Sequence, residues 1–176
     1  MDILADTNIL LRGIHRGDPQ YRQTRDPTNR LRSDGHRLCV TSQNLIELWA
    51  VCTRPLQSNG LGLTPVHDER VLGQIESSVV RLRDLDGAYP EWKGLVAQFG
   101  VSGKTTHDVR LVAAMNVHGV KRILTFNSED FTRTQKLRYY DPWTFSTASS
   151  AIELVRPERH NRQRRQSNRN TMRTSM

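Results

Sequence analysis

The sequence predicts an α/β domain with a short, mostly parallel sheet of four to five strands between two layers of helices. Short apolar runs that can form buried strands alternate along the chain with segments in which apolar residues recur every three or four positions, as on one face of a helix. Strands separated by helices of this length are typical of parallel sheets, because a parallel connection requires a crossover. The chain contains no internal repeat.

The first half of the chain predicts two strand–helix units. Proline marks their boundaries, because it interrupts helices and cannot pair inside a sheet. Pro19 and Pro27 are expected to break a weak, polar helical segment, and Pro55 to stop the second strong helix. The expected elements are, in order, a strand over residues 3–5, a helix from residue 9, the weak helix within 18–34, a strand over 38–40 and a helix that includes 45–52.

The second half predicts three helices and two more strands. Apolar residues recur at helical spacing from residue 71 to residue 82, with Pro65 placed to start that helix and Gly87 to follow its end. Gly119 is the expected C-cap of a helix that begins at Asp108. The expected elements are, in order, a loop over residues 56–65, the helix from 65 toward 87, a short helix over 90–99, the helix from 108, and strands over 122–126 and 137–140.

Composition excludes several classes of protein. The 176 residues, 36% of them hydrophobic, are enough for one well-cored domain. No uninterrupted apolar run exceeds five residues, whereas a membrane-spanning helix needs about 20, so no membrane association is expected. Asp2 and Asp6 interrupt any signal-like start, which predicts a cytoplasmic protein. Cys39 and Cys52 lie among apolar residues without a Cys/His cluster, so we expect buried thiols rather than a disulfide or a zinc site.

Positive charge is concentrated at the end of the chain. Of the net charge of +8, residues 156–176 contribute +6, through seven arginines and one acid. This segment has too few apolar side chains to fold. We therefore expect a folded domain over residues 1–145 and a basic, disordered tail over residues 146–176. Two interpretations of the tail stay open, an arm that binds nucleic-acid phosphates and a solvated extension without a task.

Acidic and amide side chains occur where the predicted strands end and the following helices begin. In open parallel sheets, ligands bind outside the carboxyl ends of the strands, so such side chains are expected to face one crevice. The residues at these places are Asp6 after the first strand, Glu47 one turn into the helix after the second, Asp108 at a helix start, and Asn127 and Asp130 after a later strand.

This group of residues predicts a metal site and hydrolytic chemistry. Carboxylates that converge on one crevice repel one another, and a bound divalent cation removes that conflict. Hard oxygen ligands without nearby Cys or patterned His favour Mg²⁺ or Mn²⁺ over zinc. Such ions lower the pKa of a bound water and stabilise the charge that develops during phosphodiester hydrolysis, which is therefore the chemistry these residues predict.

The same residues lie in four short segments, Asp6 to Leu11, Asn44 to Glu47, His107 to Ala114, and Ile123 to Asn127 with Asp130–Phe131. In this order the segments resemble the motifs of PIN-domain ribonucleases, and most closely those of the VapC-type toxins of bacterial toxin–antitoxin pairs. The likeness covers roughly residues 1–145. It implies a PIN-like three-layer fold and a Mg²⁺- or Mn²⁺-dependent endoribonuclease that cleaves RNA and whose antitoxin partner inserts a segment near the active site.

The resemblance also implies a role for each acid. Asp6, Glu47 and Asp108 correspond to metal ligands, directly or through water, and with Asn127 they are the expected catalytic residues. The fourth acidic position of the family falls at or near Asn127, where this chain has an amide. Asp130, three residues later, is a weaker candidate ligand, and the choice between one and two metal ions stays open.

Each of these residues also has an interpretation without chemistry. Asp6 and Asp108 could each be only the N-cap of a helix. Glu47 is harder to explain in this way, because an acid among apolar neighbours is costly to bury without a partner or a metal. Thr7 and Thr125 could orient carboxylates or waters through their hydroxyls.

Nearby basic and aromatic residues leave further alternatives open. Lys104 could bind a substrate phosphate but is better explained as part of a surface loop, and His107 is better explained as an exposed residue than as a proton shuttle. Trp92 is predicted to pack within the fold, with a place at an interface or against a base as the alternatives. Arg12 and Arg16 could contact RNA or belong to a solvated basic face.

Three functions are therefore compared. The leading one is a metal-dependent endoribonuclease that acts as a toxin. The second is a catalytically weak or inactive nucleic-acid-binding module, which the amide at Asn127 and the basic tail support. The third, a phosphate-binding α/β domain, is disfavoured because the chain has no glycine-rich phosphate loop. A homodimer also stays open, because an apolar stripe in residues 65–99 could face either a second copy or the core.

Overall fold

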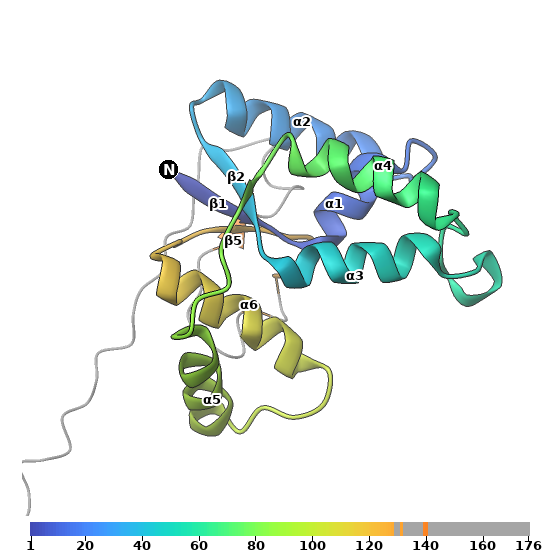
Figure 1. Cartoon of the computed structure of the whole chain (residues 1–176). Helices are drawn as coiled ribbons and strands as arrows, with labels where there is room; N and C mark the ends of the chain where they lie inside the picture. The colour runs from blue at the N-terminus through green and yellow to red at the C-terminus, as the bar shows by residue number, and fades with distance from the viewer. Residues whose placement is uncertain (129–130, 132–138, 141–176) are drawn as a thin grey trace, which may run out of the picture.

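Within the described part of the chain, five parallel strands form a sheet in the order β3-β2-β1-β4-β5, and six α-helices surround it (Figure 1). The computed structural model describes residues 1–128, 131 and 139–140. The elements are β1 (Asp2–Ala5), α1 (Thr7–Ile14), α2 (Tyr21–Ser33), β2 (Arg37–Val40), α3 (Ser42–Thr53), a 3₁₀ turn (Leu56–Ser58), α4 (Pro65–Glu76), β3 (Val80–Arg81), α5 (Ala88–Phe99), α6 (Thr105–His118), β4 (Ile123–Leu124) and β5 (Tyr139–Tyr140).

Alternate residues of the strands pack into two apolar cores, one on each face of the sheet. In β1, Ile3 and Ala5 pack on the side of α1 to α4, whereas Leu4 packs on the side of α5 and α6. Figure 1 shows the same division, with α1 to α4 on one side of the strands and α5 and α6 on the other. The predicted three-layer α/β/α class is confirmed.

The register of the central strand β1 with its two neighbours determines where the strands end relative to one another. Ala5 pairs with Leu124 of β4, and Leu4 pairs with Cys39 of β2. The N–H of Asp6 donates to the carbonyl oxygen of Leu124 over 3.0 Å, which extends the pairing by one residue. The chain therefore leaves β1 and β4 side by side, and the residues that follow both strands lie at one edge of the sheet.

The helix predicted from residue 65 toward Gly87 is too long. α4 ends at Glu76, and Val80 and Arg81 form β3, which pairs in parallel with Cys39 and Val40 of β2. The apolar residues that continue the helical spacing beyond the end of α4 are Val79 and Leu82, and they flank β3. Strand pairing with a distant segment outweighs a local periodicity of a few residues.

The helix break predicted at Pro27 is also wrong. Pro27 lies inside α2, where it is buried, although proline lacks the N–H that would complete the helical hydrogen bond. The hydroxyl of Thr28 donates to the carbonyl oxygens of Thr24 and Arg25, both over 2.9 Å, so neighbouring backbone acceptors are satisfied. Burial of one face of α2 against the sheet outweighs the lost bond.

Both cysteines are buried free thiols, as the sequence predicts. Burial raises the pKa of Cys39 and of Cys52 to about 12, so both stay protonated at neutral pH.

Across the described residues, no helix combines the length and the apolar character that crossing a membrane requires. The predicted basic tail, residues 146–176, lies outside the described residues.

One buried acid in α4, Asp68, is only weakly compensated. Asp68 is fully buried, and neither of its carboxylate oxygens accepts a hydrogen bond within the described residues. Burial raises the pKa of Asp68 above its ordinary value, and the neighbouring Cys52 thiol and His67 oppose this shift more weakly. The unfolded chain does not impose this penalty, so ionisation of Asp68 opposes folding.

We expect Asp68→Asn to increase the free energy of unfolding at pH 8 by about 1–3 kcal/mol, because it removes a buried charge that Cys52 and His67 compensate only weakly. Because the pKa of Asp68 is raised in the folded protein, protonated Asp68 contributes its full stability below the ordinary Asp pKa. This stability is lost as the pH rises through the pKa that Asp68 has in the folded protein. Urea unfolding at several pH values measures the difference between variant and wild type, which should shrink toward acid pH. The exposed Asp26→Asn is the control, and a pH-independent difference for Asp68→Asn would contradict the assignment.

Candidate metal and active site

The carboxylate of Asp6 is held at the junction of β1 and α1. Asp6 is 9% exposed, and its Oδ2 accepts hydrogen bonds from the Thr125 hydroxyl over 2.6 Å and from the Asn8 amide over 2.7 Å. Asp6 occupies the N-cap position of α1, but its side chain makes no capping hydrogen bond. The arrangement therefore favours the functional interpretation of Asp6 over a cap alone.

Asn8 and Thr125 fasten the first turn of α1 to the end of β4. The Asn8 amide donates to the Thr125 hydroxyl oxygen over 3.2 Å, and its Oδ1 accepts from the backbone N–H of Phe126 over 3.3 Å. The Thr125 oxygen also accepts from the backbone N–H of Asn127 over 3.0 Å. These bonds position Asp6 relative to the chain that follows β4.

The carboxylate of Glu47 in α3 accepts hydrogen bonds from uncharged donors. Its Oε2 accepts from the Thr7 hydroxyl and its Oε1 from the Gln43 amide, over 2.8 Å and 2.7 Å. Asn44 donates to the Thr7 oxygen over 3.2 Å and forms a reciprocal capping box with Thr41 at the start of α3. Glu47 is half-buried and forms no ion pair with any described residue, so its orientation depends on these hydroxyl and amide groups.

Asp108 lies in the first turn of α6 and is half-buried. The helix begins at Thr105 with Lys104 as its N-cap, so the alternative that Asp108 is the cap is wrong. The amide of Gln43, which holds Glu47, also donates to the carbonyl oxygen of His107 over 3.0 Å. Gln43 thereby ties the turn that contains Asp108 to α3.

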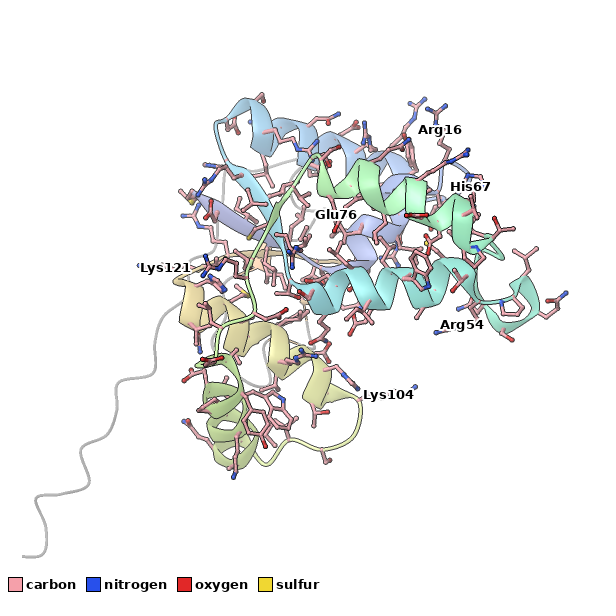
Figure 2. All side chains as sticks on the ribbon, viewed as in Figure 1. Arg16, Arg54, His67, Glu76, Lys104 and Lys121 are labelled. Carbon is pink, nitrogen blue, oxygen red and sulfur yellow. The ribbon has the colours of Figure 1, made fainter. Side chains whose placement is uncertain are left out.

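The remaining sequence candidates are Asn127, Asp130 and Lys104. Asn127 is exposed, and its side chain makes no hydrogen bond to Asp6 or Glu47. Asp130 lies outside the described residues. Figure 2 shows Lys104 in the loop that leads into α6, pointing outward, as expected for a surface-loop residue.

The donor set fits a hard divalent cation in an open site rather than in a closed cage. Among the described residues, no three His, Cys, Asp or Glu side chains approach closely enough to enclose a metal ion. Mg²⁺ commonly keeps several waters and takes only one or two carboxylates together with substrate phosphates. The carboxylates of Asp6 and Glu47 are oriented by neutral donors, in the manner of residues that support metal ligands.

Two residues of this network, Gln43 and Asn44, were not predicted as site residues. Gln43 precedes Glu47 by four positions, which places both side chains on the same face of α3. That spacing was the available signal for Gln43. The contact between Asn44 and Thr7 has no local signal, because it joins residues 37 positions apart.

Comparison with known proteins identifies the family. A profile of the PIN domain matches residues 3–137, and the chain belongs to the PIN-domain family. No curated protein sequence is measurably similar to the chain.

Solved structures with the same fold include two VapBC structures and one VapC toxin. DNA-bound VapBC from Salmonella typhimurium matches with a TM-score of 0.61 and 20% identity, covering 81% of this chain and 98% of that one. VapBC-1 from nontypeable Haemophilus influenzae matches with a TM-score of 0.60 and 16% identity, covering 81% of this chain and 99% of that one. VapC20 of Mycobacterium tuberculosis, a sarcin-ricin loop cleaving toxin, matches with a TM-score of 0.51 and 16% identity, covering 74% of this chain and 93% of that one. At these identities the likeness shows the fold.

We expect Thr125→Val to lower the free energy of unfolding by about 1–3 kcal/mol, because Asp6, Asn8 and the N–H of Asn127 each lose a partner while side-chain volume is kept. Urea unfolding followed by circular dichroism measures the change. Thr53→Val is the control: the Thr53 hydroxyl donates only to the Trp49 carbonyl within α3, and its loss should cost less than about 0.5 kcal/mol. Equal costs for the two variants would contradict a structural role for the Thr125 network.

Proposed function

We propose that the protein is a Mg²⁺- or Mn²⁺-dependent endoribonuclease that acts in the cytoplasm as the toxin of a type II toxin–antitoxin pair. One observation carries the proposal. Hydrogen bonds of Thr7 and Gln43 link the end of β1, which carries Asp6, to α3, which carries Glu47, and to the turn of α6 that contains Asp108, while hydroxyl and amide groups orient the Asp6 and Glu47 carboxylates. The nuclease domain in this proposal spans residues 1–145, with residues 146–176 as a basic extension.

Each acid has a proposed role. Asp6, Glu47 and Asp108 hold the cation, directly or through water, while Asn127 assists from the end of β4 and Asp130 is a weaker candidate ligand. When bound, the cation supplies an activated water and neutralises the charge that builds on the scissile phosphate.

The residues around the acids maintain their orientation. The Thr7 and Thr125 hydroxyls restrict the rotamers of Glu47 and Asp6, and Gln43 keeps Glu47 in line with the turn of Asp108. Because Thr7 and Gln43 are uncharged and Glu47 forms no ion pair with any described residue, the negative charge of Glu47 is available to a cation. An ion pair with Lys or Arg would instead compensate that charge within the protein.

The proposed partner is an antitoxin protein. Its support is the fold shared with the VapBC complexes of Salmonella typhimurium and Haemophilus influenzae. An antitoxin segment that reaches the acidic edge of the sheet would exclude RNA and keep the nuclease inactive.

The amide at Asn127 favours a second candidate function. A site that has lost its fourth acid has less negative charge to hold a second cation, and a nucleic-acid-binding module without hydrolysis needs none. The two functions differ in how they respond to the loss of Asp6 or Asp108. A binder keeps or gains affinity for RNA when negative charge is removed, whereas a nuclease loses turnover.

We expect the purified protein to cleave RNA from a cellular pool at discrete positions with Mg²⁺ or Mn²⁺, and not with EDTA. Asp6→Asn and Asp108→Asn should each reduce the cleavage rate by more than about 100-fold, because the loss of a metal ligand exceeds the loss of a supporting group. Mapping of new 5′ ends measures cleavage. Calorimetric titration with Mn²⁺, which does not depend on turnover, should show weaker binding in the same variants.

The matched control is Glu69→Gln, which removes an exposed acid of α4 away from the site and should leave both cleavage and Mn²⁺ binding unchanged. Metal-independent cleavage, or cleavage that survives both Asp variants, would refute the nuclease proposal. Absent cleavage together with unchanged or tighter RNA binding in Asp6→Asn would establish the binding module instead.

A further inference from the structure

A cavity of about 380 Å³ lies beside the acidic edge, between the start of α3, the segment that follows β3, and helices α5 and α6. This volume falls within the range of about 300–1,000 Å³ that is usual for small-ligand pockets. Its lining combines two aromatic rings, an arginine, an aspartate and a buried amide. The proposed nuclease chemistry uses none of these groups as a metal ligand.

Tyr89 and Trp92 of α5 form an aromatic platform at this cavity. Their ring centroids are 5.7 Å apart, and the ring planes are inclined by 31°. Tyr89 is 66% exposed, so most of its ring is accessible from solvent. The indole N–H of Trp92 donates to the carbonyl oxygen of Thr106 over 2.9 Å, so this ring is held in place before any ligand arrives.

The polar groups of the lining are placed to contact a ligand. Gln43 is only 6% exposed, and its Oε1 is buried without a hydrogen-bond partner among the described residues, while its amide nitrogen is bonded to Glu47 and to the His107 carbonyl. Arg110 is exposed and has no ion-pair partner within the described part of the chain. Asp84, which accepts from the Ser42 hydroxyl over 2.7 Å, adds a second acceptor.

The cavity and the acidic edge share structural supports. Gln43 lines the cavity and at the same time holds Glu47. Trp92 lines the cavity and is bonded to the turn of α6 that precedes Asp108. A ligand in the cavity therefore lies next to whatever occupies the acidic edge.

We propose that this cavity binds one unstacked nucleobase of single-stranded RNA, adjacent to the phosphate held at the acidic edge. The inference rests on the proposed function for its substrate class. A base stacks on Tyr89 or Trp92, its N–H groups donate to Gln43 and Asp84, and Arg110 contacts a neighbouring phosphate. Stacking on aromatic side chains and hydrogen bonding to a splayed base are the usual means by which proteins recognise single-stranded RNA.

The test is an RNA-binding measurement in EDTA, where cleavage does not contribute. Fluorescence anisotropy gives the Kd of a labelled single-stranded RNA octamer of mixed sequence and of the same ribose-phosphate chain without bases. Tyr89→Ala, at an exposed position, should weaken binding of the base-containing RNA by about 5- to 150-fold, the range expected for one lost base–aromatic stack. It should leave binding of the abasic chain unchanged.

Two matched variants separate stacking from a structural effect. Tyr89→Phe keeps the ring and should retain wild-type affinity within about twofold, because stacking does not need the hydroxyl. Phe99→Ala removes an aromatic side chain of the same helix that does not line the cavity, and should not change the Kd. Arg110→Gln should weaken binding of both RNA and the abasic chain, because the phosphate contact does not depend on a base.

Equal affinity of Tyr89→Ala and wild type for the base-containing RNA overturns the proposal, and so does an equal loss for the abasic chain. If the cavity receives an antitoxin segment instead, Tyr89→Ala leaves RNA affinity unchanged, which also overturns it. Failure of the proposed function has a different signature: metal-dependent cleavage is absent in wild type, while the base-dependent affinity and its loss in Tyr89→Ala persist.

Discussion

The pairing of β1 with β4 is the interaction on which the rest of the site depends. It joins segments about 120 positions apart and ends in two bonds, from the N–H of Asp6 to the Leu124 carbonyl and from the Thr125 hydroxyl to the Asp6 carboxylate. Because all strands are parallel, each strand ends at the same edge and is followed there by the next segment of chain. A one-residue slip of this register would turn Thr125 to the opposite face and separate it from Asp6.

Neutral donors orient two carboxylates of the acidic edge. Thr7 and Gln43 donate hydrogen bonds to the Glu47 carboxylate, and Asn8 and Thr125 donate to the Asp6 carboxylate. Hydrogen bonds of this kind fix orientation while leaving the negative charge in place. The chain has 26 Lys and Arg residues, yet Glu47 forms no ion pair with any described residue. A positively charged protein that keeps a negative edge can attract a phosphate backbone and hold a divalent cation at one place on its surface.

Gln43 connects the two proposed parts of the site. Its amide nitrogen contacts Glu47 and the His107 carbonyl, and its side chain lines the same cavity as Tyr89 and Trp92. The same side chain therefore contacts both the cavity and a proposed metal ligand. This arrangement gives a physical route by which a bound base could influence the position of a metal ligand.

Several features followed from the sequence alone. The alternation of short apolar strands with helical segments predicted the three layers, because the faces of β1 and β2 are both buried and need cover on both sides. The acids at strand ends predicted the edge at which Asp6 and Glu47 are found. Only the tertiary structure decided the rest: β3 forms because Val80 pairs with Cys39, and Glu47 is oriented because Thr7 reaches it from α1. Such contacts depend on strand register and helix packing over long separations, which local periodicity does not encode.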